Sequence, residues 1–375
     1  MSAAPLAGCR VLDLGIITAG ASTSALLADL GADVIKVESS AYIDPFRAWD
    51  RGLGARDWWN KSRFFDFTNR NKRGIALDLK TAEGRQLFLD LAAGADVVVE
   101  NFRRGVLDRL GLGYAALSER NPRIVLASVT SQGETGPDAK AASYGSTLEA
   151  TSGLSDLTRD ANGKPLISGV LLNYPDQIVS IYAAGVITLA VMEQRRTGKG
   201  TWLDISQREL ASFLIGEHIL AASAGAAPAT PPSASATRLV QAGDGRWLLC
   251  HAGSQEALER ALRAVMPSTR PAEAASSLIA AFAAHDVQAI VVRNGDDMLA
   301  AVRSGESRTA FTLTPDGSDV KGMPFTLAGS PLQVRRRAPG LGEHNTEILR
   351  DLLGLDEPAI AALAERGIIG SAPKG

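Results

Sequence analysis

Short apolar segments alternate with helix-like segments between residues 11 and 130, and this alternation constrains the fold more than any other feature. The predicted strands are rich in valine, isoleucine and leucine and lie at Val11–Leu14, Val34–Glu38, Gly74–Leu79, Asp96–Glu100 and Ile124–Val129. Helix signals separate them, such as Gly31 at the end of the first helix and Thr81 as a possible cap of a later one. Strands joined by helical crossovers run parallel. We therefore expect an α/β protein whose parallel sheet carries helices on both faces.

The composition changes near residue 221, which indicates a second domain. The 375 residues exceed what a single core usually supports. The segment 221–237 is rich in alanine, proline and serine and predicts a linker. Beyond it the patterns predict a hairpin at 242–245, alanine-rich helices, a strand at 287–292, a strand pair turning at 315–317, and amphipathic helices at 345–355 and 357–366.

Composition and charge exclude several classes of protein. A net charge of −2 gives no electrostatic basis for binding nucleic acid or a membrane. Cys9 and Cys250 lie far apart, and the four histidines form no pair with metal-ligand spacing, so neither a disulfide framework nor a metal site is expected. The apolar run Ile178–Met192 is shorter than the roughly 20 residues of a membrane span. Without a signal-peptide pattern at the N-terminus, we expect a soluble, cytoplasmic protein.

One acidic residue, Asp176, precedes this apolar run and is the only acid between Asp160 and Glu193. It has two interpretations. As a helix N-cap, its carboxylate would accept a backbone N–H bond, and because aspartate is common at caps the residue alone favours this role. As a nucleophile or acid/base group, it would be an anion stabilised by the positive end of the helix.

Other familiar site patterns are incomplete. The first strand leads into a loop with Gly15 and Gly20, and the second ends at Glu38, but the glycine spacing is not that of a dinucleotide or phosphate-binding loop. No serine or cysteine lies in a nucleophile motif, so covalent chemistry would fall to a carboxylate. Basic residues flank several strands, namely Arg70, Lys72, Arg73, Lys80, Arg103, Arg104 and Arg109. Together they could receive a phosphate-rich ligand at the carboxyl edge of the sheet.

Several sequence blocks, in order along the chain, resemble the family III CoA transferases, a family that also includes the α-methylacyl-CoA racemases. The blocks are Pro5–Gly8 leading into the first strand, Leu27–Glu38, Asn69–Ile75, Val99–Arg103, Leu110–Tyr114, Gln132–Pro137, Arg196–Gly200 and Pro339–Leu349. The likeness spans the chain and is weakest in residues 205–320.

The resemblance implies a covalent role for Asp176, which occupies the position of the family's nucleophile. It would attack an acyl-CoA to give a mixed anhydride and then an aspartyl-CoA thioester, and CoA would pass to an acceptor carboxylic acid. Coenzyme A and acyl-CoA would be substrates, and no cofactor would be bound permanently. The residues implied to contact CoA are Thr18, Ala19, Leu77, Lys80, Asn101, Phe102, Arg103, Arg109 and Tyr144.

Departures from the family pattern leave alternatives open. Ser39 and Ala142 replace residues that are commonly basic, with Lys140 as a possible substitute, so a catalytically idle CoA-binding relative remains an alternative. The racemase branch uses a histidine in a Gly-His-Asp stretch, whereas this chain has Ser143-Tyr144-Gly145, so transfer is preferred over racemisation. The glycine-rich loop of formyl-CoA transferases has no match here, which argues against oxalate and formate and leaves the acceptor acid open.

The family architecture completes the expectation. A large Rossmann-like, CoA-binding domain would comprise residues 1–225 and 321–375, and a smaller α+β domain residues 226–320, with linkers near 221–237 and 300–325. The family forms an interlocked, ring-like homodimer, so we expect a homodimer that binds acyl-CoA and carboxylic acid substrates, with no nucleic-acid or membrane partner.

Overall fold

The computed structural model describes residues 4–49, 56–160, 162–168, 173–225, 236–267, 272–306, 311–323, 325–329 and 332–374. The chain divides into two compact units. Unit 1 comprises residues 1–216 and 310–375, so it contains both ends of the chain, and unit 2 comprises residues 217–309. Residues 226–235 of the predicted linker lie outside the described residues.

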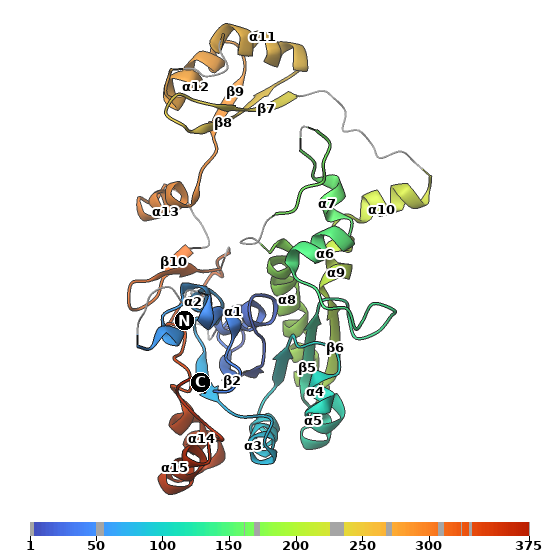
Figure 1. Cartoon of the computed structure of the whole chain (residues 1–375), viewed down its shortest axis with the longest axis vertical. Helices are drawn as coiled ribbons and strands as arrows, with labels where there is room; N and C mark the ends of the chain where they lie inside the picture. The colour runs from blue at the N-terminus through green and yellow to red at the C-terminus, as the bar shows by residue number, and fades with distance from the viewer. Residues whose placement is uncertain are drawn as a thin grey trace. The chain divides into compact units, whose positions relative to one another are not determined.

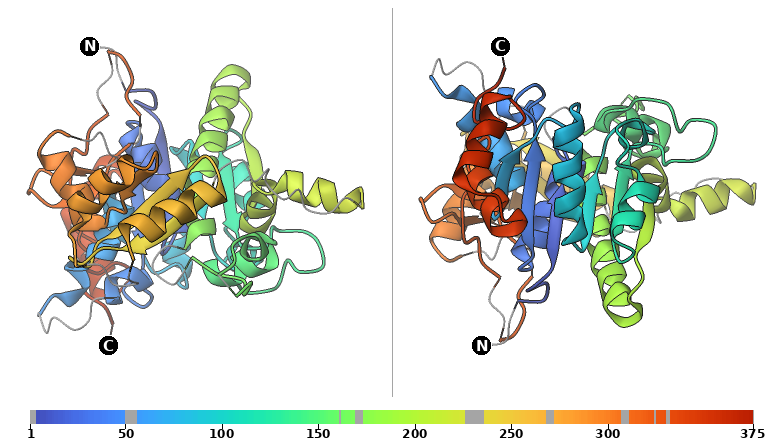
Figure 2. Two further views of the ribbon diagram at one scale, coloured as in Figure 1. Left: turned by 90° about the horizontal axis from the view of Figure 1, so that it is seen from above. Right: turned by 90° about the horizontal axis from the view of Figure 1, so that it is seen from below.

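Unit 1 is built on a parallel sheet (Figures 1 and 2). The strands are β1 (Arg10–Asp13), β2 (Asp33–Glu38), β3 (Arg73–Ala76), β4 (Val97–Glu100), β5 (Val125–Thr130) and β6 (Thr201–Ser206). Their spatial order is β3-β2-β1-β4-β5-β6, and every neighbouring pair is parallel. This confirms the predicted α/β class and parallel sheet. The sixth strand was not predicted.

Helices cover both faces of this sheet, as Figure 2 shows in the view from below. On one face, α1 (Ala19–Asp29) and α8 (Tyr174–Thr197) pack over a core that includes Val11, Val99 and Val125. The other face carries α3 (Ala82–Ala93), α5 (Tyr114–Arg120), α14 (Asn345–Leu353) and α15 (Glu357–Glu365). Strand residues alternate between the two cores, as the period-two geometry of a strand requires.

Short elements connect these layers. They are η1 (Pro45–Ala48), η3 (Trp58–Asn60), α2 (Arg63–Asn69), α4 (Val106–Arg109), α6 (Gly145–Thr151), α7 (Leu154–Leu157), α9 (Gln207–Phe213) and the antiparallel pair β10 (Phe311–Leu313) and β11 (Asp319–Lys321). The turn between β10 and β11 is the one predicted at residues 315–317, and the division of the chain places this pair in unit 1.

Unit 2 has a smaller antiparallel sheet with its own core. Its strands are β7 (Ala236–Gln241), β8 (Trp247–Ala252) and β9 (Gln288–Val291), and its helices are α11 (Gln255–Val265), α12 (Ala275–Ala283) and α13 (Gly295–Arg303). The helix α10 (Gly216–Ser223) begins at the boundary of the two units. Leu248, Leu258, Leu278 and Phe282 are buried at the centre of this core, so the small α+β unit is confirmed.

Helix α8 is longer than the apolar run suggested. Its 24 residues are long and apolar enough, by length and composition alone, to cross a membrane. However, Val179, Ala183, Ile187 and Val191 are buried against the sheet and α1. A core helix satisfies the same criterion, so this feature is weak support for a membrane span.

Two ion pairs with fully buried side chains lie beneath the loop that joins β1 to α1. In the first, the Lys36 Nζ is 3.0 Å from Asp44 Oδ2. In the second, the Lys72 Nζ is 2.8 Å from Asp13 Oδ2 and also binds the Asn69 side chain. We call these the two buried ion pairs. A buried charge without a partner is strongly destabilising, so each member is needed by the other.

We predict that Lys72→Met lowers the free energy of unfolding by about 3–5 kcal/mol, because Asp13 then remains charged and unpaired in the core. Urea unfolding followed by circular dichroism measures this. The exposed Lys199 supplies the matched control, since Lys199→Met should change the value by less than about 0.5 kcal/mol. The double variant Asp13→Asn/Lys72→Met should recover part of the loss. Equal effects of Lys72→Met and Lys199→Met would contradict this account.

Candidate functional site

The loop joining β1 to α1 lies at the carboxyl edge of the sheet, where β1 neighbours β4. The chain leaves β1 toward β2 on one side and leaves β4 toward β5 on the other. Open α/β sheets bind ligands at such a switch point, because the two departing connections leave a crevice between them. The residues that follow β1 and β4 therefore define where to look for a site.

Close packing explains the two glycines of this loop. A Cβ on Gly15 would lie 2.4 Å from the Gly20 carbonyl carbon. A Cβ on Gly20 would lie 2.7 Å from Asn101 Oδ1. Both positions therefore exclude a side chain. This requirement accounts for the glycines without a bound dinucleotide.

Asn101 joins the ends of β1 and β4. Its Oδ1 accepts the Ile16 N–H at 2.8 Å, and its Nδ2 donates to the Ile16 carbonyl at 3.1 Å. The next residue, Ile17, has a φ of 59°, which is strained for a β-branched side chain. Its N–H donates to Asp44 Oδ1 at 3.2 Å, and Asp44 is held by Lys36. The loop is therefore fixed from both sides before any ligand binds.

Asp176 lies in the first turn of α8, as its third residue. The N-cap position belongs to Asn173, whose φ is 45° and whose side chain makes no capping bond. The N-cap interpretation of Asp176 is therefore wrong. Among the described residues, none donates a hydrogen bond to the Asp176 carboxylate. Its backbone is better held than its side chain, because Ser180 Oγ donates to the Asp176 carbonyl at 2.6 Å.

Two neighbours bring Asp176 to the switch point. Ser180 Oγ also lies 3.1 Å from the Ala19 carbonyl, which links the second turn of α8 to the first turn of α1. On the other side, a Cβ on Gly145 would lie 2.9 Å from Asp176 Oδ2. Gly145 begins α6 and follows Tyr144, so the absent side chain lets the carboxylate pack directly against the start of that helix.

Burial raises the pKa of Asp176 to about 7. No charged group is among the causes of this shift, so the carboxylate is desolvated without a compensating cation. It is nevertheless partly exposed, so a ligand can reach it. A partly desolvated carboxylate that receives no hydrogen bond from the described residues is suited to nucleophilic attack.

The other residues of the predicted CoA set lie at helix starts or after strands of the sheet. Thr18 is the buried N-cap of α1, and Tyr144 is a highly exposed residue before α6. Leu77 and Lys80 follow β3 at the far edge of the sheet, while Phe102, Arg103 and Arg109 follow β4. The contacts of Asn101, Ser180 and Gly145 thus connect the β1–α1 loop with the starts of α8 and α6. The structure gives no contact between Asp176 and either Leu77, Lys80, Arg103 or Arg109.

One cavity of about 330 Å³ includes a residue of the predicted set, Arg103. The stacked rings of Tyr114 and Trp202, 6.5 Å apart between centroids, also line it. Glu100 is buried at this cavity, and burial raises its pKa to about 7. The aromatic pair suits a planar ring. Asp108 and Glu134 line the cavity beside Arg103 as well, so the charge there does not favour a phosphate.

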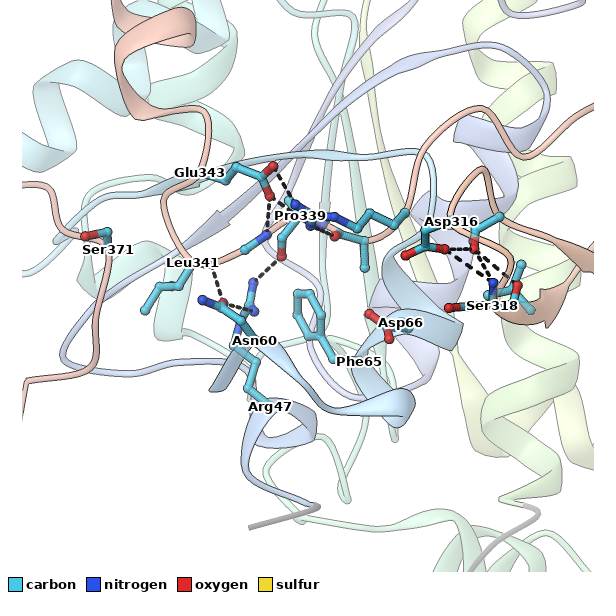
Figure 3. Close-up of a pocket in the computed structure, with 15 residues that line it drawn as sticks. Arg47, Asn60, Phe65, Asp66, Asp316, Ser318, Pro339, Leu341, Glu343 and Ser371 are labelled. Atoms are coloured by element: carbon cyan, nitrogen blue, oxygen red, sulfur yellow. Dashed lines mark hydrogen bonds and ion pairs between the residues drawn. The ribbon is translucent and has the colours of Figure 1, made fainter. Parts of the chain in front are cut away.

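Figure 3 shows a different cavity, of about 470 Å³, which contains none of the predicted residues. Its arginines already bind carboxylates. Arg47 Nη2 lies 2.7 Å from Glu38 Oε2, and Arg337 Nη2 lies 2.9 Å from Glu343 Oε1. Because these cations are paired, this cavity offers a phosphate-rich ligand little charge.

Sequence reasoning missed several residues beside Asp176. Gly145 and Ser180 were not singled out for their contacts with it, and no local pattern marks them. Gln132 is buried and donates to Ser143 Oγ at 2.7 Å, two residues before Gly145, while its Oε1 has no partner. Lys321 Nζ lies 2.7 Å from Gln177 Oε1, directly after Asp176 in the chain. These contacts link residues that are distant in sequence, so only the fold reveals them.

An α/β fold with a desolvated carboxylate near the switch point of its parallel sheet is an arrangement typical of an enzyme. The family model described as CoA-transferase family III matches residues 6–276. The chain belongs to CoA-transferase family III, as its sequence blocks indicated, and its enzyme class is CoA transferase.

Characterised relatives and solved structures agree with this assignment. A succinate–glutarate CoA-transferase of Agrobacterium fabrum is 30% identical, over 95% of this chain and 97% of its own. A succinyl-CoA–D-citramalate CoA-transferase of Chloroflexus aurantiacus is also 30% identical, over 97% of this chain and 98% of its own. An acyl-CoA transferase of Fusarium pseudograminearum is 40% identical, although the match covers 56% of this chain and 46% of that protein. The crystal structure of a CaiB/BaiF family protein from Brucella suis superposes with a TM-score of 0.82 at 28% identity, over 94% of this chain and all of that one.

We predict that kcat/KM for acyl-CoA rises between about pH 6 and pH 8 and then levels off, because attack requires the ionised form of a carboxylate whose pKa is raised to about 7. Initial rates across this range measure the inflection. Glu100→Gln is the control, since burial also raises the pKa of Glu100 to about 7. If the inflection disappears in Glu100→Gln, the titration belongs to Glu100. A flat profile would contradict the raised pKa of Asp176.

Proposed function

We propose that this enzyme moves CoA from an acyl-CoA donor to a carboxylic acid acceptor through covalent intermediates on Asp176. The observation that carries the proposal is the placement of an unpaired, desolvated carboxylate at the switch point of the sheet. The relatives named above support it, because their names describe CoA transfer to or between carboxylic acids such as succinate and glutarate.

The first half of the reaction loads the enzyme. An Asp176 carboxylate oxygen attacks the thioester carbonyl of the donor, the C–S bond breaks, and an acyl-aspartyl anhydride forms with release of CoA thiolate. The thiolate then attacks the aspartyl carbonyl of the anhydride and expels the donor acid. The product is an aspartyl-CoA thioester. This route divides one difficult exchange into steps between reactive acyl species.

The second half reverses this sequence with the acceptor. The acceptor carboxylate attacks the aspartyl carbonyl and expels thiolate, which gives a new anhydride. Thiolate then attacks the acceptor acyl carbon, so that the new acyl-CoA leaves and the Asp176 carboxylate is restored. Each attack places negative charge on a carbonyl oxygen. The first-turn N–H groups of α1, linked to α8 through Ser180 and Ala19, are candidates to stabilise it.

We predict that wild-type enzyme incubated with succinyl-CoA and then hydroxylamine carries an aspartyl hydroxamate at Asp176, because hydroxylamine attacks the activated aspartyl carbonyl. Peptide mass spectrometry locates the modification. Asp176→Asn should lose about a thousandfold or more of the transfer rate.

The control for this experiment is Glu193→Gln, which alters an exposed acid at the far end of the same helix. It should retain both the transfer rate and the modification at Asp176. A turned-over donor with unmodified Asp176 in the wild-type enzyme would refute the covalent route.

We also propose that the enzyme functions as an interlocked homodimer, as the family resemblance implies. The face of α8 that does not touch the sheet exposes Ile181, Tyr182, Leu189 and Met192, each at least half exposed. Phe213 in α9 is 75% exposed. A soluble monomer rarely leaves so many large apolar side chains on one surface, so a second copy is the occupant we assign to it.

Light scattering at micromolar concentration should therefore give about twice the chain mass of 39.3 kDa. If the two chains are interlocked, tagged and untagged dimers mixed under native conditions should not exchange subunits, since separation requires unfolding. Refolding the mixture should produce tagged–untagged dimers. A monomer mass would overturn the dimer, and rapid native exchange would overturn interlocking alone.

A further inference from the structure

A lysine from a distant part of the chain reaches the flank of Asp176. Lys321 is the last residue of β11, and its Nζ donates to Gln177 Oε1 at 2.7 Å. Gln177 follows Asp176 in the first turn of α8, and the two contacting residues are 144 positions apart in sequence. Because successive helix residues point about 100° apart, Lys321 lies beside the carboxylate and not in front of it.

Lys321 has no anionic partner among the described residues. No carboxylate oxygen of these residues lies within 4.0 Å of its Nζ, and its one hydrogen bond is to a neutral amide. The fully buried lysines Lys36 and Lys72, by contrast, each contact an aspartate. Lys321 is only partly buried, so a ligand can approach it.

The surroundings of Lys321 favour an incoming anion. Burial, together with the nearby positive charge of Arg70, lowers its pKa. Arg70 is itself paired with Asp29, whereas the partly desolvated ammonium group of Lys321 has no anion beside it among the described residues. A bound carboxylate would relieve this cost. Asp176 is not the anion that pairs with Lys321, because burial alone accounts for the raised pKa of Asp176. The hydrogen bond to Gln177, the residue after Asp176, places the ammonium group of Lys321 on the flank of this carboxylate.

We propose that Lys321 binds the remote carboxylate of a dicarboxylic acid while the other carboxyl group reacts at Asp176. The enzyme would then select dicarboxylic over monocarboxylic acids of equal length. This inference rests on the proposed function, since it requires Asp176 to be the group that receives the acyl carbon. A monocarboxylic acid would place a methyl group against the ammonium and leave Lys321 unpaired, which the site penalises.

The experiment compares acids that differ only in the remote carboxylate. Acetyl-CoA is the fixed donor, and succinate is compared with butyrate, and glutarate with valerate. The wild-type enzyme should prefer each dicarboxylic acid by about tenfold or more in kcat/KM. Lys321→Gln should lower kcat/KM for succinate and glutarate by about tenfold to a hundredfold, the value of one charge-assisted contact, and change that for butyrate and valerate by less than about twofold.

Two further variants make the result specific to this position. Lys321→Arg keeps the charge and should retain most of the preference for dicarboxylic acids. Lys199→Gln removes an exposed lysine beyond the other end of α8 and should leave both classes of acid unaffected. Thermal unfolding of each variant shows whether the fold is intact.

The outcomes separate the two levels of the argument. If the wild-type enzyme transfers CoA to none of the acids, the proposed function fails, and this inference fails with it. If the wild-type enzyme transfers CoA equally well to both members of each pair, the function stands and the role of Lys321 is wrong. An equal loss for both classes in a folded Lys321→Gln variant, with no rescue by Lys321→Arg, would also overturn it.

Discussion

The two buried ion pairs beneath the β1–α1 loop, Lys36–Asp44 and Lys72–Asp13, are the interaction on which the site depends. Taking four charges out of water is costly, so such groups persist only where each has a partner and further hydrogen bonds. Much of this additional bonding goes to the loop. Asp13 accepts the Gly15 N–H, Lys36 binds the carbonyl of the same residue, and Asp44 accepts the N–H two positions later. The ion pairs therefore hold the strained loop in place. Asn101 binds this loop, and Ser180 of α8 binds the start of α1 that follows it.

The Asp176 carboxylate has the opposite surroundings. The carboxylates of the ion pairs are neutralised and hydrogen-bonded, whereas that of Asp176 receives no hydrogen bond from the described residues, and burial raises its pKa. A desolvated anion without donors is destabilising for a fold, but it retains its lone pairs for attack on a carbonyl carbon. The rigid loop and the link from Ser180 to Ala19 hold this group in place. The two buried ion pairs thus stabilise the loop beneath the site, whereas the Asp176 carboxylate is left desolvated and unpaired among the described residues.

The sequence predicted the elements whose pattern is local. Five strands of the sheet were predicted within a few residues of their bounds, because each is a buried apolar run. The sixth, β6, was missed because it is an edge strand whose first four residues are exposed or partly exposed, and apolar periodicity does not mark it. The cap role predicted from Asp176 alone failed because the N-cap of the helix is Asn173, three residues earlier. At the site, the family blocks predict Asp176 as the nucleophile, and this role stays a prediction. Gly145 and Lys321 could not be predicted, since folding alone brings them near Asp176.

Three buried or partly buried lysines of unit 1 differ in whether an acidic side chain lies beside them. Lys36 lies within β2 and Lys72 directly precedes β3, and each forms a buried ion pair with an aspartate. Lys321 comes from a small antiparallel pair far along the chain, and it meets only a glutamine amide. If folding were its only role, an aspartate or glutamate beside it would stabilise the protein more than an amide does. The absence of an anion beside Lys321 among the described residues agrees with the proposal that a substrate carboxylate binds there, because the ion pair then forms only when a correct acid is bound.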